Sequence, residues 1–301
     1  MRKLKFVISL MTSDNDYQIE QAHSAELAAH KHGADFQILY AENDAITQST
    51  QILRVIQAPP VERPDAIVFE PVGGTALPQV ARAAVDTGIG WAVLNRDVSY
   101  VRELRKTAKV PVFGVSHDQL EIGRIQARQC AALLPSGGTI LYLQGPSDNP
   151  VAKERFLGME EAKPANIHPI MLKGQWTEDS AQRAVRSWLK LTTSHKTVVD
   201  AVIAQNDVMA MGARKALQEL PSEAERERWF ELPFAGVDGV PKTGQAWVRS
   251  GLLTATIITP PNAGQAIELF VDACENSKMP PERIHIDPVS SPSLEALRNR
   301  K

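Results

Sequence analysis

Short, almost wholly apolar runs alternate with longer amphipathic stretches along the chain of 301 residues. The apolar runs are typical of strands buried on both faces, and the amphipathic stretches are typical of helices that cover such strands. The expected strands are 4–11, 35–40, 66–70, 90–94, 111–115, 139–144, 168–172, 200–204, 233–237, 253–258 and 283–287. The expected helices are 17–33, 48–57, 76–87, 118–134, 149–162, 178–192, 208–219, 241–250 and 262–277. The alternation predicts an α/β protein with parallel sheets.

The same order of segments occurs twice. The stretch from Asp65, DAIVFEPVGGTALPQVARAAVDTGIGWAVLNRD, matches the stretch from Asp200, DAVIAQNDVMAMGARKALQEL, which continues after a longer connection into LPFAGVDG. Upstream, LKFVISLMTSDNDYQIEQAHSAELAAHKHG matches GGTILYLQGPSDNPVAKERFLGMEEA. Two similarly wound halves, each with its own parallel sheet, account for these matches, and the length also favours two domains.

Composition excludes several classes of partner. The formal net charge is −2, so the chain lacks the basic field that nucleic acid binding needs. Cys130 and Cys274 lie far apart and are expected as small buried side chains. His23, His30 and His32 share one expected helix without an acidic cluster nearby, so no metal site is expected. No nucleotide motif is present either, and the chain is expected to use no cofactor.

The first residues, MRKLKFVISLMTSDND, combine basic residues with a short apolar run. That run is shorter than the hydrophobic region of a secretion signal or a membrane span, so we expect it to be the first strand. The protein is expected in the periplasm or cell envelope if an export signal has been removed, and in the cytoplasm if Met1 is the native start.

Polar side chains follow the expected strands, where open α/β sheets bind their ligands. They are amides, carboxylates, guanidinium groups and aromatic rings, without a paired nucleophile and base, so the chain is not expected to be an enzyme. Acceptors and planar donors of this kind suit the hydroxyls of a neutral sugar or polyol, and an aromatic ring suits the apolar face of a sugar. The sequence therefore favours a binding site for such a molecule.

Some of these residues have structural alternatives. Asp14, Asp148 and Asp207 stand before expected helices and are expected as N-caps. In the Asn206-Asp207 pair, Asp207 would then cap the helix and leave Asn206 to reach a ligand. The structural alternative for Trp176 is a packing residue, and the alternative for Arg96 is a member of a surface ion pair.

Four motifs in order, LNRD, AQNDVMAMGARKAL, FAGVDGVP and GLLTATIITPP, resemble the type I periplasmic sugar-binding proteins. This is the ribose-binding-like branch, which shares its fold with the ligand-binding part of Lac-repressor-type regulators, and the resemblance covers nearly the whole chain. It implies two Rossmann-like domains joined by three crossovers, near His117, Thr259-Pro260 and Ile286-Asp287. The implied domains are 1–117 with 260–286, and 118–259 with 287–301, each forming one ligand-binding lobe.

The resemblance also implies ligand-binding residues in both domains. In the first domain they are Asp14, Asn15, Tyr17, Asn95 and Arg96. In the second domain they are Arg155, which lies three residues before a glycine, and Trp176, Asn206, Asp238 and Thr259.

Three positions depart from the ribose-binding pattern. Relatives often carry Asp where this chain has Asn95, and Gln where it has Thr259. Tyr17 is followed by Gln18 rather than by a second aromatic residue. We therefore expect a sugar of different shape, or a polyol, rather than ribose.

The function implied by the resemblance is binding of a small neutral sugar or polyol in an interdomain cleft that closes by hinge motion. The protein would act as a monomer and deliver its ligand to the membrane permease of an ABC-type importer. The alternative is a ligand-sensing input domain that signals to a receptor or kinase. A DNA-binding version would need a helix-turn-helix segment before the first strand, so we do not expect the sequence as given to be a self-contained repressor.

Overall fold

The computed structural model describes residues 2–74 and 76–299. The chain divides into two compact units, Met1–His117 with Pro261–Ile286, and Asp118–Pro260 with Asp287–Lys301. It passes from one unit to the other after His117, after Pro260 and after Ile286. The second crossover was expected between residues 259 and 260. It lies one residue later, because Pro260 belongs to the second unit.

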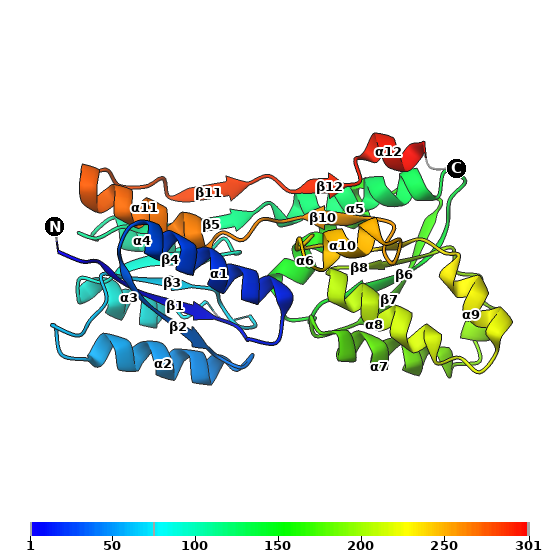
Figure 1. Cartoon of the computed structure of the whole chain (residues 1–301), viewed down its shortest axis with the longest axis horizontal. Helices are drawn as coiled ribbons and strands as arrows, with labels where there is room; N and C mark the ends of the chain where they lie inside the picture. The colour runs from blue at the N-terminus through cyan, green and yellow to red at the C-terminus, as the bar shows by residue number, and fades with distance from the viewer. Residues whose placement is uncertain (1, 75, 300–301) are drawn as a thin grey trace. The chain divides into compact units, whose positions relative to one another are not determined.

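The first unit contains a parallel sheet with the strand order β11-β5-β4-β3-β1-β2 (Figure 1). Its strands are β1 (Lys5–Leu10), β2 (Asp35–Tyr40), β3 (Ala66–Phe69), β4 (Gly90–Leu94), β5 (Val112–His117) and β11 (Arg283–Ile286). The strand order reverses between β1 and β3, which is where ligands bind in sheets of this type, beyond the carboxyl ends of the strands.

Helices cover both faces of this sheet, because alternate residues of each strand point to opposite sides. Phe6, Ile8 and Leu10 of β1 pack in one apolar cluster, and Val7 packs in another. Figure 1 shows α1 and α11 on one side of the sheet and α2 on the other. The helices of this unit are α1 (Asp16–Lys31), α2 (Ala45–Gln57), α3 (Pro78–Asp86), α4 (Tyr100–Arg105) and α11 (Ala263–Asn276).

The second unit repeats this plan with a parallel sheet of order β7-β6-β8-β9, which matches β2-β1-β3-β4 of the first unit. Its strands are β6 (Gly138–Gln144), β7 (Ile167–Lys173), β8 (Ala201–Ala204) and β9 (Phe234–Ala235), with an antiparallel pair of β10 (Thr256–Ile258) and β12 (Val289–Ser291).

The aspartates that begin the sequence repeat have equivalent roles in the two units. Asp65 accepts from the Lys5 backbone N–H at 2.9 Å, and Asp200 accepts from that of Thr139 at 2.7 Å. The α/β fold class with two similar halves is confirmed.

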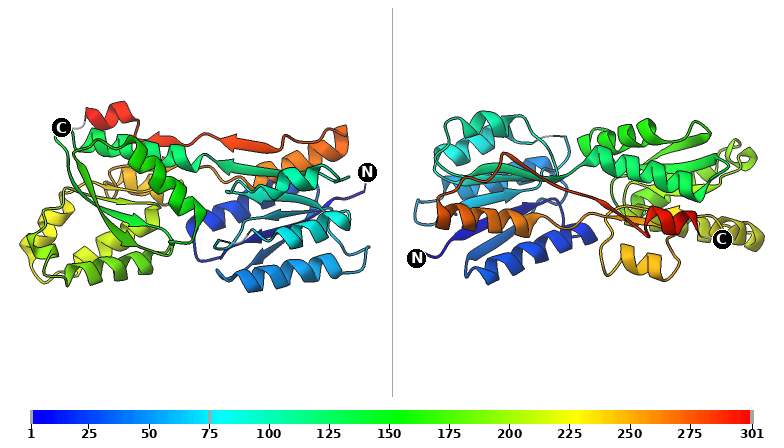
Figure 2. Two further views of the ribbon diagram at one scale, coloured as in Figure 1. Left: turned by 180° about the vertical axis from the view of Figure 1, so that it is seen from behind. Right: turned by 90° about the horizontal axis from the view of Figure 1, so that it is seen from above.

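The helices of the second unit also lie on both faces of their sheet. They are α5 (Gln119–Leu133), α6 (Pro150–Ala162), α7 (Glu178–Leu189), α8 (Asp207–Gln218), α9 (Glu223–Phe230), α10 (Gly244–Arg249) and α12 (Leu294–Arg298), with a short 3-10 helix at Ser194–Lys196. Helices α5 and α6 lie side by side (Figure 2). A Cβ on Gly123 would lie 2.0 Å from the Arg155 carbonyl oxygen, and one on Gly158 would lie 1.9 Å from that of Leu120. Two glycines thus let the helix backbones touch and fix the place of Arg155 on α6.

Several elements differ from the sequence-based expectation. Helices α4, α9 and α12 and strand β12 were not expected, because each is short and buries few residues; α9, for example, buries only Trp229. Strands β9 and β10 are shorter than the apolar runs from which they were predicted. Residues in these two runs pair through the isolated bridges Ala235–Ala255 and Asp238–Ile258 instead of a continuous ladder. Cys130 is buried as expected, whereas Cys274 is exposed.

Candidate ligand-binding site

In the first unit, Asn95 lies at the centre of a polar cluster beyond the carboxyl ends of the strands. Its Oδ1 accepts from the Tyr17 hydroxyl at 3.3 Å and from Asn262 Nδ2 at 2.8 Å. Its Nδ2 donates to Glu70 Oε1 at 3.0 Å. The structure thus brings together the predicted residues Tyr17 and Asn95, and it orients the Asn95 amide through two partners that were not among the predicted ligand-binding residues.

Glu70 is one of these additional residues. Its side chain is buried at the end of β3, where Gln21 Nε2 also donates to it at 3.3 Å. Burial raises the pKa of Glu70 above its ordinary value, and the hydrogen bond from Asn95 and the charge of Arg96 partly offset this. A carboxyl group buried among amide donors is costly unless it is well partnered, so the cluster is a preformed polar site.

Gln21 joins this cluster to the start of α11. Its Oε1 accepts from the backbone N–H groups of Asn262 and Ala263 at 2.9 and 2.8 Å, and its Nε2 donates to Asn262 Oδ1 at 2.7 Å. Gln21 therefore satisfies N–H groups that the helix itself leaves without partners. The signal in the sequence was a glutamine on the alanine-rich, buried face of α1.

Arg96 follows Asn95 and is buried with 8% exposure, so it is not an ordinary surface ion-pair residue. Its Nη2 donates to the Gly73 carbonyl oxygen at 2.7 Å. Asp14, by contrast, has an exposed side chain, and its backbone N–H donates to Thr12 Oγ1 at 3.2 Å. Of the predicted residues in this unit, Tyr17 and Asn95 belong to the cluster, Arg96 acts electrostatically on its Glu70, and Asn15 caps the start of α1.

In the second unit, Arg155 is the buried cation, with 7% exposure. Its Nε donates to Gln119 Oε1 at 2.9 Å, and its Nη1 donates to the Gln205 carbonyl oxygen. The guanidinium carbon lies 5.6 Å from the centre of the Trp176 ring, within the range of a cation–π contact. The predicted pair of Arg155 and Trp176 is thus brought together, and Gln119 and Gln205 hold the arginine in place.

Trp176 is half-buried and lies close to the backbone of Gly145, where an added Cβ would be 2.3 Å from the ring. Its backbone has a left-handed φ of 63°. The other predicted site residues with left-handed φ are Asn95 at 55° and Asp238 at 106°. Non-glycine residues rarely adopt this conformation, and such strain concentrates at functional sites. It therefore supports the assignment of these three positions to a site.

The expected helix caps are wrong by one residue. The residues that cap α1, α6 and α8 with their side chains are Asn15, Asn149 and Asn206. Asp14 and Asp148 lie one residue too early and are exposed, and Asp207 is the first residue inside α8. Asn206 Oδ1 accepts from the Met209 N–H at 2.9 Å, so the roles expected for Asn206 and Asp207 are reversed in this respect.

Asp238 and Thr259 lie together at the carboxyl end of the second sheet. The Thr259 backbone N–H donates to the Asp238 carbonyl oxygen at 3.0 Å, and the Asp238 N–H donates to that of Ile257 at 3.0 Å. Thr259 is buried, with 3% exposure, and Asp238 is half-buried. Asp238 thus presents its side chain from a turn that is fixed on both sides by backbone hydrogen bonds.

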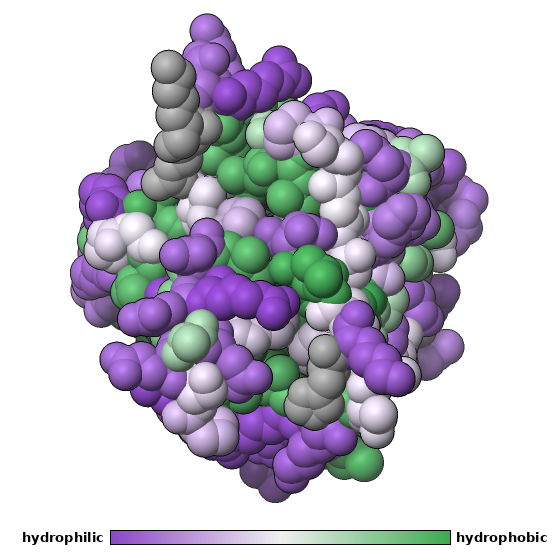
Figure 3. All heavy atoms as spheres, turned by 90° about the vertical axis from the view of Figure 1, so that its right-hand side faces the viewer, coloured by the Kyte–Doolittle hydropathy of each residue, from purple (hydrophilic) through white to green (hydrophobic). Residues whose placement is uncertain are grey.

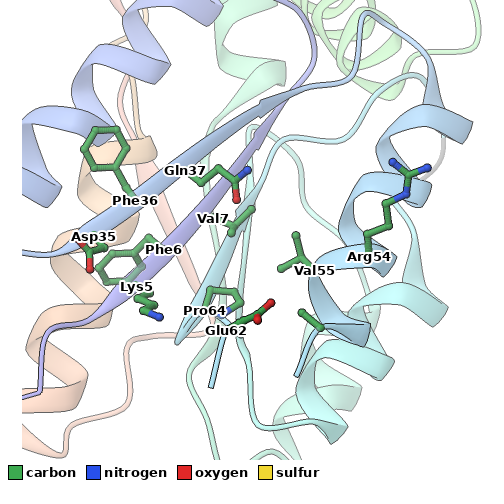
Figure 4. Close-up of a pocket in the computed structure, with 11 residues that line it drawn as sticks. Lys5, Phe6, Val7, Asp35, Phe36, Gln37, Arg54, Val55, Glu62 and Pro64 are labelled. Carbon is green, nitrogen blue, oxygen red and sulfur yellow. The ribbon is translucent and has the colours of Figure 1, made fainter. Parts of the chain in front are cut away.

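A pocket of about 370 Å³ lies in the first unit (Figure 4). Lys5 and Asp35 line it and are the first residues of β1 and β2, and Arg54 of α2 lines it too. This pocket therefore lies at the amino ends of the strands, away from the polar cluster around Asn95.

Among the described residues, His, Cys, Asp and Glu side chains form no group of three that would hold a metal ion. Within residues 2–74 and 76–299, no helix combines the length and apolar character needed to cross a membrane.

Hydrophilic and apolar side chains are interleaved on the face shown in Figure 3, as on most protein surfaces.

Comparison with known proteins places the chain in a family. The family described as "Periplasmic binding protein domain" matches residues 6–278. A putative rhizopine-binding protein of Rhizobium meliloti is 29% identical over 62% of this chain and 58% of its own length. A xylitol-binding protein of Mycolicibacterium smegmatis is 30% identical over 70% of this chain and 55% of its own length. The chain thus matches little more than half the length of these two relatives.

The fold also matches solved structures. An ABC transporter periplasmic solute binding protein from Actinobacillus succinogenes with bound D-allose has a TM-score of 0.81 and 21% identity, over 99% of this chain and 100% of that one. The relatives named here are binding proteins by description. Together with the match over residues 6–278, the two similar parallel sheets establish that the chain belongs to the periplasmic binding protein domain family.

Proposed function

We propose that this chain binds a small neutral sugar or polyol and delivers it to the membrane permease of an ABC-type importer. The observation that carries the proposal is that each unit combines a buried arginine with a half-buried aromatic ring at the polar end of its sheet. The first unit has Arg96 and Tyr17, and the second has Arg155 in contact with Trp176. A sugar needs both planar donors for its hydroxyls and an aromatic face for its C–H surface.

The charges favour a neutral ligand. Arg96 acts electrostatically on Glu70, and Arg155 acts on Asp207. An acidic side chain within electrostatic range of each buried arginine makes these positions better suited to a neutral ligand than to an acid. The descriptions of the related proteins, which name xylitol and D-allose, support this class of ligand.

Both polar clusters would serve one ligand. A protein that favours the open form by 99:1 needs about 10⁴-fold tighter binding to the closed form, or about 5.5 kcal/mol, to become predominantly closed. Hydrogen bonds to charged groups contribute about 1.5–3 kcal/mol each, so a few such bonds from each unit are enough. The closed form would be the signal that a permease recognises. We place this activity in the periplasm, where a solute-binding protein meets its importer.

A panel of ligands tests the proposal. Thermal unfolding and intrinsic Trp fluorescence would be measured with D-allose, D-ribose, D-xylose, D-glucose, myo-inositol and xylitol. D-glucuronate would serve as the acidic control matched to D-glucose. A ligand at a hundred times its Kd stabilises the folded protein by about 2.7 kcal/mol, which is readily measured. We expect at least one neutral compound to bind and D-glucuronate to be silent; binding of the acid alone would contradict the proposal.

Transport needs a separate test. Deletion of the gene should abolish high-affinity uptake of the radiolabelled compound that binds best, and the wild-type gene should restore it. Unchanged uptake together with loss of a transcriptional response to the compound would instead favour the role of a sensor input.

A further inference from the structure

Asp207 is a buried carboxylate that ligand binding, as proposed above, does not use directly. It is the first residue of α8 and has 3% exposure. Two glycines form the slot around it: a Cβ on Gly236 would lie 2.2 Å from Asp207 Oδ1, and one on Gly244 would lie 1.9 Å from Oδ2. The backbone at these two positions thus approaches the carboxylate more closely than a residue with a Cβ would allow.

Asp207 is bonded to the residues on both sides of Asp238. Its backbone N–H donates to the Val237 carbonyl oxygen at 2.7 Å. Its Oδ2 accepts from the Gly239 N–H at 2.8 Å. Between these two contacts, Asp238 has a φ of 106° and Gly239 a φ of 57°, so the turn is held in a conformation that Asp238 would not adopt on its own.

We propose that Asp207 is a positioning residue for ligand binding, which fixes the Val237–Gly239 turn and so directs the Asp238 side chain. This inference rests on the proposed function in one respect, that Asp238 contacts the ligand. The second carboxylate oxygen, Oδ1, accepts from the Thr256 hydroxyl at 2.7 Å, which anchors the carboxylate to β10.

Burial of the Asp207 carboxylate costs free energy, which indicates that the residue has a role besides starting the helix. Burial raises the pKa of Asp207 well above its ordinary value, and the nearby charge of Asp238 raises it further, while the bonds from Thr256 and Gly239 lower it. A helix start needs no buried acid beside another acid, because Asn206 already caps α8. The carboxylate instead provides two acceptor oxygens, one for the turn and one for β10.

Substitutions at Asp207 separate positioning from general stability. Asp207→Ala removes the acceptor for the Gly239 N–H and should weaken binding about ten- to a hundredfold. Asp207→Asn keeps one acceptor for Gly239, and its amide can donate to the Thr256 hydroxyl, so affinity should stay within about threefold of the wild type. Thr256→Val is the matched control: it removes the contact at Oδ1 and leaves the Gly239 bond, so it should lower stability without a comparable loss of affinity.

The experiment combines titration calorimetry with amide hydrogen exchange, using the strongest binder of the panel above as the probe. Exchange at the Gly239 N–H should accelerate at least about tenfold in Asp207→Ala and stay slow in Asp207→Asn. If Asp207→Ala does not fold, Asp207→Ser, whose hydroxyl is too short to span the slot, replaces it with the same expectations. The double variant Asp207→Ala/Asp238→Ala should bind no more weakly than Asp238→Ala alone, because Asp207 acts through Asp238.

Each result counts for or against the inference. Unchanged exchange at Gly239 in Asp207→Ala overturns it whether or not a ligand binds, and so do additive effects on Kd in the double variant. If no panel member binds, or if Asp238→Ala alone leaves affinity unchanged, the proposed function or its site assignment fails. The exchange rate at Gly239 then decides by itself whether Asp207 holds the turn.

Discussion

Asn206 donates from Nδ2 to the Trp176 carbonyl oxygen at 3.0 Å and thereby joins the start of α8 to the loop that carries the Trp176 ring. Its Oδ1 caps the same helix. Asn206 is buried, with 2% exposure, and its side chain is engaged within the protein through both ends of the amide. The residue first expected to reach the ligand therefore also determines where the aromatic ring lies.

We expect Asn206→Ala to lower the free energy of unfolding by about 1–2 kcal/mol, because it removes the helix cap and the bond to Trp176. Chemical denaturation would measure the loss. Trp emission would report the released ring, although four other tryptophans contribute, so Trp176→Phe serves as the reference. A loss below about 0.5 kcal/mol, the level of an ordinary surface substitution, would contradict the assignment.

The cap of α6 offers a matched pair of neighbouring residues. Asn149 Oδ1 accepts from the Val151 N–H at 2.9 Å, whereas the Asp148 side chain is exposed. Asn149→Ala should cost about 1 kcal/mol of stability and Asp148→Ala almost none. The opposite order in urea denaturation would restore Asp148 as the cap.

Gln21 should be more important than its residue type suggests. Gln21→Ala leaves two backbone N–H groups at the start of α11 without their acceptor, and an unsatisfied buried group costs about 1–3 kcal/mol. Thermal and urea unfolding should therefore show a large loss of stability. Gln37→Ala, at an exposed glutamine on β2, is the control and should be almost neutral. Equal effects in the two variants would rule out the role of Gln21.

Asp207 should also give stability a defined pH dependence. Its pKa is raised in the folded protein, so between about pH 4, where the unfolded chain ionises, and the folded-state pKa, the folded state binds more protons. Stability therefore falls as pH rises through this window. Asp207→Asn removes the titration, so its stability relative to the wild type should increase with pH from about 4 upward. Urea denaturation at several pH values tests this, and a constant difference would contradict it.

The fold could be predicted from the sequence because its strands and helices have strong periodicity and occur in two matching sets. Strands such as β2 and β4 have the expected bounds, since turn residues limit both ends of their apolar runs. The short helices α4 and α9 could not be predicted, because they bury few residues and depend on tertiary contacts.

The candidate site was less predictable. Residue types after the expected strands, together with the family resemblance, pointed to Asn95, Arg96, Arg155 and Trp176, and the structure gives each of them a buried or partly buried place beside other polar groups. The sequence did not reveal the bond between Gln21 and Asn262, because 241 positions separate these residues and a helix-face glutamine has no distinctive spacing. The caps were displaced by one residue because Asp and Asn are equally good caps, and the path of the backbone decides between neighbours.

The buried place of Arg155 changes the expectation for its variants. Because the guanidinium already bonds Gln119 and the Gln205 carbonyl, Arg155→Ala should lower stability as well as affinity, which a residue that contacted only the ligand would not do. Arg155→Lys, which keeps the charge but loses the planar fork, should retain more stability than Arg155→Ala and still bind weakly. Equal unfolding free energies for Arg155→Ala and the wild type would contradict this.

Titration calorimetry of the best panel ligand against the wild type, Arg96→Lys and Arg155→Lys tests the central claim most directly. If both polar clusters serve one neutral ligand, the wild type will bind one molecule per chain, and each variant will weaken that single event by about tenfold or more. Two independent binding events, or full affinity in either folded variant, would contradict the account.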